Sequence, residues 1–165
     1  MESVFNSIRQ SLNTENYLAA LALALTIPDI CGKVEFPNEK VGDRYCEWYT
    51  NYVDNAYNFP PPKCNPDDLP IPPRFSASDC YQLRCAILHS WSIDMDFDKV
   101  NFDLFKLYKN TSVVSGVRWE QGKPQTAKSY IYLDITRFCQ TMCDVAEEYY
   151  NTRKADFSKY HIEIQ

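Results

Sequence analysis

The chain has little of what several enzyme classes require. Only 4 of its 165 residues are glycine, and only 2 are histidine. It contains no glycine-rich phosphate loop, no Gly-x-Ser-x-Gly turn and no His-Glu-x-x-His pair. These are the local patterns of P-loop enzymes, α/β-hydrolases and zinc metalloproteases. The sequence therefore argues against these three classes.

Positive charge is also scarce. The chain has 17 lysines and arginines against 22 acidic residues, which gives a formal net charge of -5. A protein that holds a long nucleic acid does so through many cationic contacts, and no broad basic surface of that kind is expected here. Any contact with a nucleic acid should therefore be local.

The sequence has no long uninterrupted apolar segment. Its opening residues, Met1 to Phe5, lack the charged, apolar and small-residue regions of a secretory signal. The strongest apolar run, from Tyr17 to Ile30, contains Pro28 and Asp29 and is shorter than a bilayer span. It predicts a buried helix, no membrane segment and a cytoplasmic protein.

The seven cysteines are odd in number and form no Cys-x-x-Cys pair. This usage is typical of reduced core thiols rather than of a disulfide framework. Zinc is the alternative for Cys80 with Cys85 and for Cys139 with Cys143, but these spacings differ from a zinc knuckle and no His pair is near. We therefore predict neither a metal nor a cofactor.

Apolar residues spaced by three and four predict a mainly helical chain. Helices are expected near residues 3–12, 14–30, 38–53, 76–91 and 134–150. Pro28 either kinks the second of these or begins a new helix that ends at Gly32. Aromatic and β-branched runs at 102–108, 112–119 and 130–133 predict a small β-hairpin or three-stranded insertion near 100–133. We expect one domain over residues 1–165, an antiparallel helical bundle with this insertion.

Two segments are expected to be irregular. Seven of the ten prolines fall between Pro60 and Pro73, which excludes a regular helix or inner strand there. A long loop is the expected structure, and a domain boundary is the competing interpretation. After Asn151 the periodicity fades, so an exposed tail or a short docking segment is expected.

An aromatic stripe marks one face of the expected third helix. Its members are Val41, Tyr45, Trp48, Tyr49 and Tyr52. Such a stripe usually belongs to a core. A base-stacking surface is the alternative, but basic neighbours are missing.

The helix after the proline-rich segment is expected to begin with a capping box at Ser76 to Asp79. Its apolar residues Cys80, Leu83, Ile87, Leu88 and Trp91 are predicted to enter the core. Arg84 and His89 interrupt this pattern, and burial of either without a partner would be costly. Five residues correspond to about 140° of helix rotation, which a long arginine side chain can bridge.

An arginine beside a histidine supplies the chemistry of metal-independent RNA cleavage. A guanidinium can hold a phosphate through two hydrogen bonds, and an imidazole can move a proton to or from a ribose hydroxyl. Arg84 and His89 are therefore the candidate catalytic residues. Supporting roles are assigned to Tyr81, which can orient the arginine, contact a base or simply pack, and to Ser90 and Asp94, which can fix the imidazole tautomer.

The string YQLRCAILHSW, from Tyr81 to Trp91, resembles the Arg-x(4–6)-His motif of the HEPN family. The resemblance implies a HEPN-like bundle and a homodimer whose motif helices form one composite site. It also implies a metal-independent endoribonuclease, the effector of a bacterial defence or toxin–antitoxin system with an antitoxin or defence protein as partner. Arg84 and His89 are the matching positions. Many catalytic members have a polar residue directly after the arginine, and Cys85 stands there in this chain. This departure favours the alternative, a non-catalytic nucleotide-binding or protein-interaction module.

A structural role for the same residues is the competing interpretation. Arg84 would then pair with an acidic residue such as Asp79 or Glu47. His89 would interact with the carbonyl end of its helix. His161 matches no motif spacing and is expected at the surface.

Overall fold

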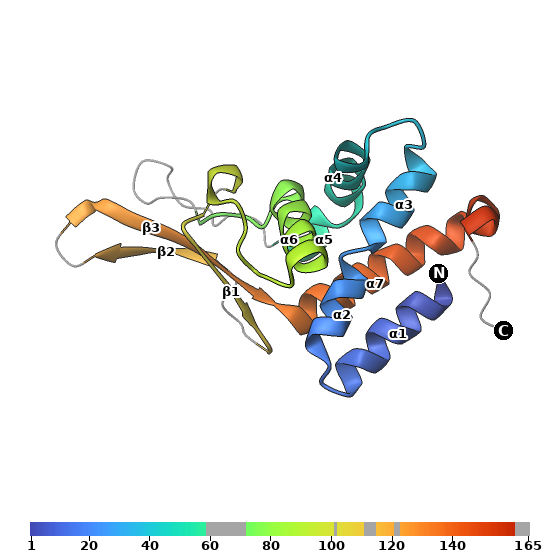
Figure 1. Ribbon diagram of the computed structural model, residues 1–165, viewed down its shortest axis with the longest axis horizontal. Helices are drawn as coiled ribbons and strands as arrows, with labels where there is room; N and C mark the ends of the chain where they lie inside the picture. Colours follow the sequence, from blue (N-terminus) through green and yellow to red (C-terminus); the bar gives the residue numbers. More distant parts are fainter. Residues whose placement is uncertain (59–71, 101, 111–114, 121–122, 161–165) are drawn as a thin grey trace.

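The computed structural model describes residues 1–58, 72–100, 102–110, 115–120 and 123–160. Its α-helices are α1 (Glu2–Asn13), α2 (Tyr17–Ala24), α3 (Ile27–Glu35), α4 (Val41–Tyr52), α5 (Asp54–Tyr57), α6 (Ala77–Ser90) and α7 (Ile135–Thr152). Short 3-10 helices are η1 (Phe97–Lys99) and η2 (Lys154–Tyr160), and the strands are β1 (Leu104–Tyr108), β2 (Ser115–Glu120) and β3 (Lys123–Asp134). The chain is thus mainly helical with a small three-stranded sheet, as the sequence predicts (Figure 1).

The starts of α6 and α7 follow from their capping residues. In the capping box of α6, Ser76 Oγ accepts the Asp79 N–H at 3.2 Å and Asp79 accepts the Ser76 N–H at 2.8 Å. Asp134 caps α7 by accepting the Arg137 N–H at 3.1 Å. These side chains satisfy N–H groups that have no partner within the helix. Both predicted helix starts are confirmed.

The apolar run near the N-terminus forms two helices rather than one. Pro28 lies in the first turn of α3, where its missing N–H costs no helix hydrogen bond. The second of the two outcomes expected for Pro28 is therefore observed, although α3 continues past Gly32 to Glu35. Leu21 and Leu25 are fully buried, as expected for a core segment.

Residues 17–35 are also, within the described part of the chain, the one stretch long and apolar enough to cross a membrane. Eighteen consecutive residues of this stretch have a mean hydropathy of 1.5, and 44% of them are buried inside the protein. One such stretch near the N-terminus is a weak sign, because the core helix of a soluble protein meets the same criterion. The break between α2 and α3 and the burial of Leu21, Leu25 and Ile27 favour the core helix.

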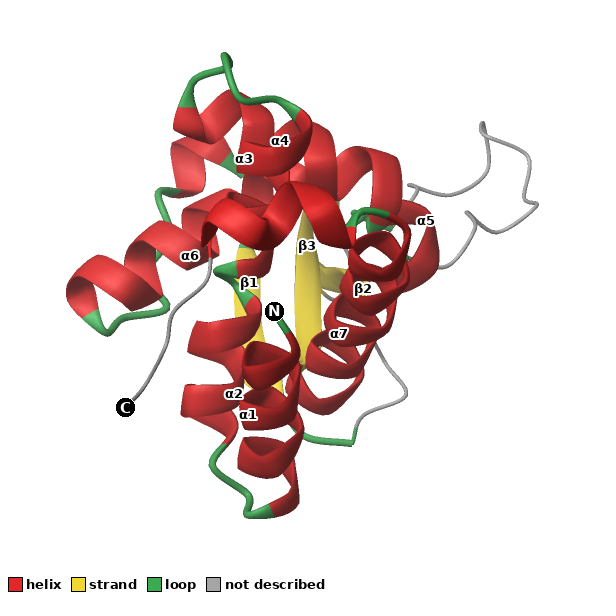
Figure 2. Cartoon of the chain, turned by 90° about the vertical axis from the view of Figure 1, so that its right-hand side faces the viewer, coloured by secondary structure: helices red, strands yellow, loops and turns green. Residues whose placement is uncertain are grey.

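Helices and sheet share one core. Helix α7 follows β3 directly and contacts α1, α2, α3 and α5, and Figure 2 shows α1 and α2 beside α7 with the strands behind them. The aromatic stripe of α4 enters this core, since Tyr45, Trp48 and Tyr49 are fully buried. The core interpretation of that stripe is therefore correct.

The sheet has the strand order β1-β3-β2. Strands β2 and β3 form an antiparallel hairpin, and β1 adds to β3 in parallel. The insertion predicted near 100–133 is thus a hairpin extended by a third strand. Strand β3 begins at Lys123, well before the predicted Tyr130. The sequence did not signal this start, because Lys123, Pro124 and Ala127 are of types that are depleted in strands.

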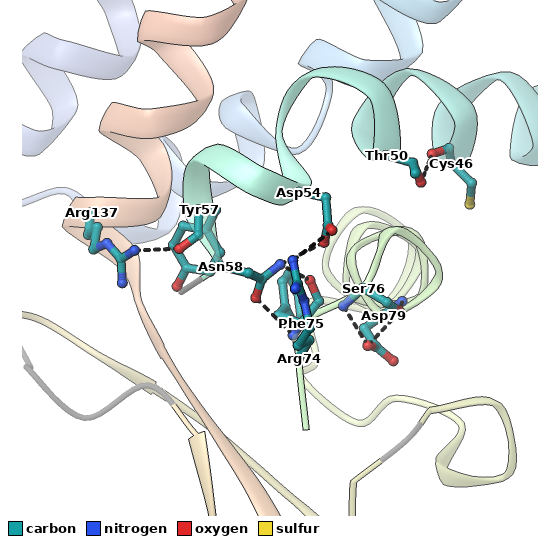
Figure 3. A network of polar contacts seen from close by, with 10 residues as sticks. All are labelled: Cys46, Thr50, Asp54, Tyr57, Asn58, Arg74, Phe75, Ser76, Asp79 and Arg137. Carbon is teal, nitrogen blue, oxygen red and sulfur yellow. Dashed lines mark hydrogen bonds and ion pairs between the residues drawn. The ribbon is translucent and has the colours of Figure 1, made fainter. Parts of the chain in front are cut away.

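The proline-rich loop predicted between Pro60 and Pro73 lies mostly outside the described residues. Its flanks are held together by the polar network in Figure 3. The Asn58 amide donates to Asp54 at 2.7 Å and to the Phe75 carbonyl at 3.0 Å, and it accepts the Phe75 N–H at 3.2 Å. Arg74 adds an ion pair to Asp54 at 2.9 Å. These bonds fix the start of α6 against the end of α5.

Segment η2 (Lys154–Tyr160), which follows α7, docks onto the helices. Phe157 in η2 is buried and meets the rings of Tyr149 and Tyr150 edge-on, at centroid distances of 6.0 and 5.2 Å. Of the two alternatives expected after Asn151, the docking segment is observed up to Tyr160, and residues 161–165 lie outside the described ones.

Candidate functional site

Arg84 and His89 meet near the C-terminal end of α6. The Nη1 atom of Arg84 lies 3.2 Å from Nε2 of His89. His89 is exposed, whereas the Arg84 side chain is only 19% exposed. The long arginine side chain therefore bridges the rotation between the two positions, as the sequence suggested.

The partner that holds Arg84 is Asp29 of α3. Arg84 Nε donates to Asp29 Oδ2 at 2.9 Å, and both side chains are 19% exposed. The prediction that Arg84 pairs with Asp79 or Glu47 is wrong. Asp79 is occupied by the capping box, and Glu47 lies on the exposed side of α4.

The environment keeps Arg84 charged. Partial burial lowers the pKa of its guanidinium, but the charge of Asp29 and the hydrogen bond to it more than offset this, so the pKa is raised overall. The Cys85 thiol interacts with the same guanidinium. Arginine has five N–H groups, so donors remain for an anion after these contacts.

The contact with Arg84 limits how His89 can form a hydrogen bond. A guanidinium can only donate, so a hydrogen bond in this contact requires Nε2 of His89 as the acceptor and the ring proton on Nδ1. A neutral imidazole with an accepting nitrogen is the form that can act as a general base.

Tyr81, Ser90 and Asp94 were expected to support Arg84 and His89. Tyr81 packs edge-on against Tyr45 at a centroid distance of 5.2 Å, which fits a packed tyrosine. Ser90 is exposed, and Asp94 accepts a hydrogen bond from Ser92 Oγ at 2.8 Å. Among the described residues, no hydrogen bond joins His89 to Ser90 or Asp94.

Trp91 was expected in the core, and this prediction is wrong. Its side chain is 77% exposed. Helix α6 ends at Ser90, and Trp91 turns away with a left-handed backbone, φ 50°. Helical spacing no longer applies beyond that turn, so the indole lies outside, two residues after His89.

Asp29 is the site residue that sequence reasoning missed. A signal for it existed, because an acidic residue inside an apolar run requires a cationic partner if it is buried. Which cation it meets depends on the packing of α3 near α6. That packing is not encoded by local spacing.

The cysteines do not form a second site in the described structure. The six described cysteines form no disulfide, and within the described residues no group of three or more His, Cys, Asp and Glu side chains is placed to hold a metal. Burial raises the pKa of Cys31, Cys80 and Cys139, and it raises that of Cys143 to about 11. These four thiols belong to the core.

Comparison with models of known families, with curated proteins and with solved structures finds no match to this chain. The function is therefore inferred from the arrangement of Asp29, Arg84 and His89.

Proposed function

We propose that this chain is a HEPN-like, metal-independent endoribonuclease that acts in the cytoplasm. The observation that carries the proposal is the 3.2 Å contact between Arg84 and the exposed His89. Asp29 supports it by holding Arg84 at 2.9 Å, which limits the freedom of a long side chain.

The proposed reaction is transesterification within the RNA. The phosphate takes the N–H groups of Arg84, including the one that now points to His89, and this releases Nε2. Nε2 then accepts the proton of the ribose 2′-hydroxyl as the 2′-oxygen bonds to phosphorus. The bond from phosphorus to the 5′-oxygen breaks, and a second acid protonates that oxygen. A 2′,3′-cyclic phosphate and a 5′-hydroxyl result.

The second acid is proposed to come from another copy of the chain. The resemblance to HEPN proteins implies a homodimer in which two motif helices face each other. The exposed end of α6, with His89 and Trp91, is available for such an arrangement. A defence-system or antitoxin protein that covers this end would then control the activity.

The test is cleavage of mixed cellular RNA in EDTA by the purified wild type and by His89→Ala. Loss of a general acid–base group typically lowers the rate about 10²- to 10⁴-fold, so we expect cleavage by the wild type and almost none by His89→Ala. Melting should be unchanged because His89 is exposed. The matched control is His161→Ala, which removes the other histidine and should cleave normally. Equal cleavage by wild type and His89→Ala would reject the proposal.

Two variants of Arg84 distinguish a catalytic role of this residue from a structural one. Arg84→Lys keeps the charge opposite Asp29 but loses the planar fork, so we expect folded protein with strongly reduced cleavage. Arg84→Ala leaves Asp29 without its partner and should lower the free energy of unfolding by about 1–3 kcal/mol. A stability loss without any change in cleavage would favour the purely structural role.

A non-catalytic module that binds a nucleotide or a protein is the second candidate. Cys85 directly after Arg84, where many catalytic members of the family have a polar residue, favours it. In that case neither wild type nor variant cleaves RNA, and a bound nucleotide raises the melting temperature. Ligand at 100 times its Kd stabilises a protein by about 2.7 kcal/mol, which is readily measured.

A further inference from the structure

A row of three tyrosines crosses the outer face of the sheet. Tyr130 and Tyr132 lie two residues apart on β3 and therefore on the same face. Their ring centroids are 4.7 Å apart, and Tyr108 of β1 continues the row at 4.9 Å from Tyr132. Tyr108 is 39% exposed. We call these three residues the tyrosine row.

The opposite face of the sheet belongs to the core. Phe105, Ile131 and Leu133 alternate with the tyrosines and are buried. Phe105 stacks on Phe75 at 5.9 Å, which joins this face to the helices. The tyrosine row therefore faces away from the core that the sheet shares with the helices.

The strands are built to hold the row in place. Gly116 of β2 pairs with Tyr130, and a Cβ at Gly116 would come within 3.0 Å of the Tyr130 ring. The ring thus lies directly over a residue that has no side chain. Aromatic rings held against a sheet in this way present surface on which planar groups can stack.

Cationic residues flank the row. Lys106 pairs with Tyr132, and Lys128 lies two residues before Tyr130 on the same strand; both are exposed. Asp103, the acidic residue before β1, is occupied by hydrogen bonds from Ser129 at 2.7 and 3.0 Å.

The segment that contains the strands has a positive formal charge, although the whole chain is acidic. Residues 104–133 contain five basic residues, Lys106, Lys109, Arg118, Lys123 and Lys128, and one acidic residue, Glu120. Their formal charge is thus +4 in a chain of net charge -5, which leaves -9 for all other residues. A positive segment in an acidic protein can attract a polyanion locally.

We propose that the tyrosine row, with Lys106 and Lys128, binds single-stranded nucleic acid by stacking of bases on the rings and pairing of phosphates with the lysines. Aromatic side chains beside cationic ones on a sheet are the combination by which proteins hold unpaired bases. A duplex cannot use the row, because its bases are stacked on each other. This surface is separate from the pair Arg84 and His89 and does not rest on the proposed cleavage.

The test measures binding of fluorescein-labelled oligonucleotides by anisotropy, with His89→Ala protein so that no probe is cut. The probes are single-stranded RNA, single-stranded DNA of the same sequence and duplex RNA, each longer than the roughly 4–16 nucleotides that one binding face covers. We expect both single strands to bind and the duplex to bind at least tenfold more weakly. Preference for RNA over DNA would assign the natural ligand to RNA, and equal binding would assign it to unpaired strands of either kind.

Substitutions of Tyr108, Lys106 and Lys128 test whether the nucleic acid binds to the tyrosine row. Tyr108→Leu should weaken single-strand binding about tenfold, since stacking on one aromatic ring contributes roughly 1–3 kcal/mol, and Tyr108→Phe should bind nearly as the parent does. Lys106→Gln with Lys128→Gln should reduce the slope of log Kd against log salt by about 1.4. The matched control, Lys33→Gln with Lys40→Gln, makes the same charge change on the helices and should leave the slope almost unchanged.

Three results would overturn the proposal. They are unchanged binding by folded Tyr108→Leu, equal loss of binding in both double-lysine variants, and duplex binding as tight as single-strand binding. A change of oligomeric state in Tyr108→Leu, seen by sedimentation, would instead assign the row to an interface between two copies. Binding without cleavage by the wild type would reject only the ribonuclease proposal, and cleavage with binding unaffected by these variants would reject only this one.

Discussion

Trp91 combines two unfavourable properties at one position. Its indole is 77% exposed, and its backbone is left-handed with φ 50°. A left-handed backbone costs most residues about 1–2 kcal/mol. The position is the C-cap of α6, where its N–H donates to the Ile87 carbonyl at 3.1 Å, and glycine is the usual residue at such helix ends.

Trp91→Gly should therefore stabilise the protein. We expect the free energy of unfolding to rise by about 0.5–1 kcal/mol, because the strain is relieved and little packing is lost. Denaturant unfolding measures the change. Ser90→Gly, one residue earlier at a position without positive φ, is the matched control and should lower stability. A loss of stability in Trp91→Gly would mean that the indole makes contacts that stabilise the fold.

At the residue scale, local patterns predicted the caps but not the ionic partner of Arg84. Ser76 with Asp79, and Asp134 with Arg137, act within three residues, so their roles follow from sequence alone. Asp29 and Arg84 are separated by 55 residues. Their pairing depends on how separate helices pack, which no short pattern contains.

At the element scale, α3 and α4 approach so closely that Gly32 allows no side chain. A Cβ at Gly32 would lie 2.6 Å from the Arg44 carbonyl oxygen and 3.1 Å from its carbon. Both atoms belong to the backbone of α4, which cannot rotate away. A glycine that looked in the sequence like a helix end thus marks a helix contact.

Gly32→Ala should force α3 and α4 apart. We expect the free energy of unfolding to fall by about 1–3 kcal/mol, the usual cost of overpacking. Gly42→Ala is the control, since a Cβ there would meet the Tyr81 ring at an ordinary 3.4 Å and alanine favours helix. It should be neutral or slightly stabilising. Equal stability of the two variants in urea would contradict the close approach.

The strands show why some elements were harder to locate. The aromatic and β-branched run from Tyr130 to Leu133 predicted the end of β3. The start of β3 pairs with β2 although its own residues favour a turn, so its structure depends on the partner strand. The tyrosine row also depends on pairing, because Tyr108 comes from a different strand.

At the scale of the whole molecule, the six described cysteines differ in how deeply they are buried. Cys31, Cys80, Cys139 and Cys143 are buried, and Cys46 and Cys85 are half-buried. The thiolate is the reactive form, and burial raises the pKa of each of the four core thiols and also that of Cys46. The four core thiols differ from Cys46 and Cys85 in that their side chains are closed to solvent.

Alkylation of the native protein at mildly alkaline pH should therefore modify Cys46 and Cys85 well before the four core thiols. The core thiols should react only through opening of the fold. Peptide-level mass spectrometry after timed labelling gives each rate, and labelling in denaturant is the control in which all thiols react alike. Similar alkylation rates for all six cysteines in the native protein would contradict the burial of Cys31, Cys80, Cys139 and Cys143.

By itself the sequence determined that the chain is mainly helical, where α6 and α7 begin, and that Arg84 and His89 lie within reach of each other on one helix. These features depend on residues a few positions apart, and the geometry of a helix fixes such relations. Only the tertiary structure decided that Asp29 holds Arg84, that Trp91 is exposed, and that three tyrosines from two strands form a row beside lysines. Each of these depends on which elements pack or pair. Packing is decided by the burial of the whole apolar surface at once, so a local pattern cannot specify it.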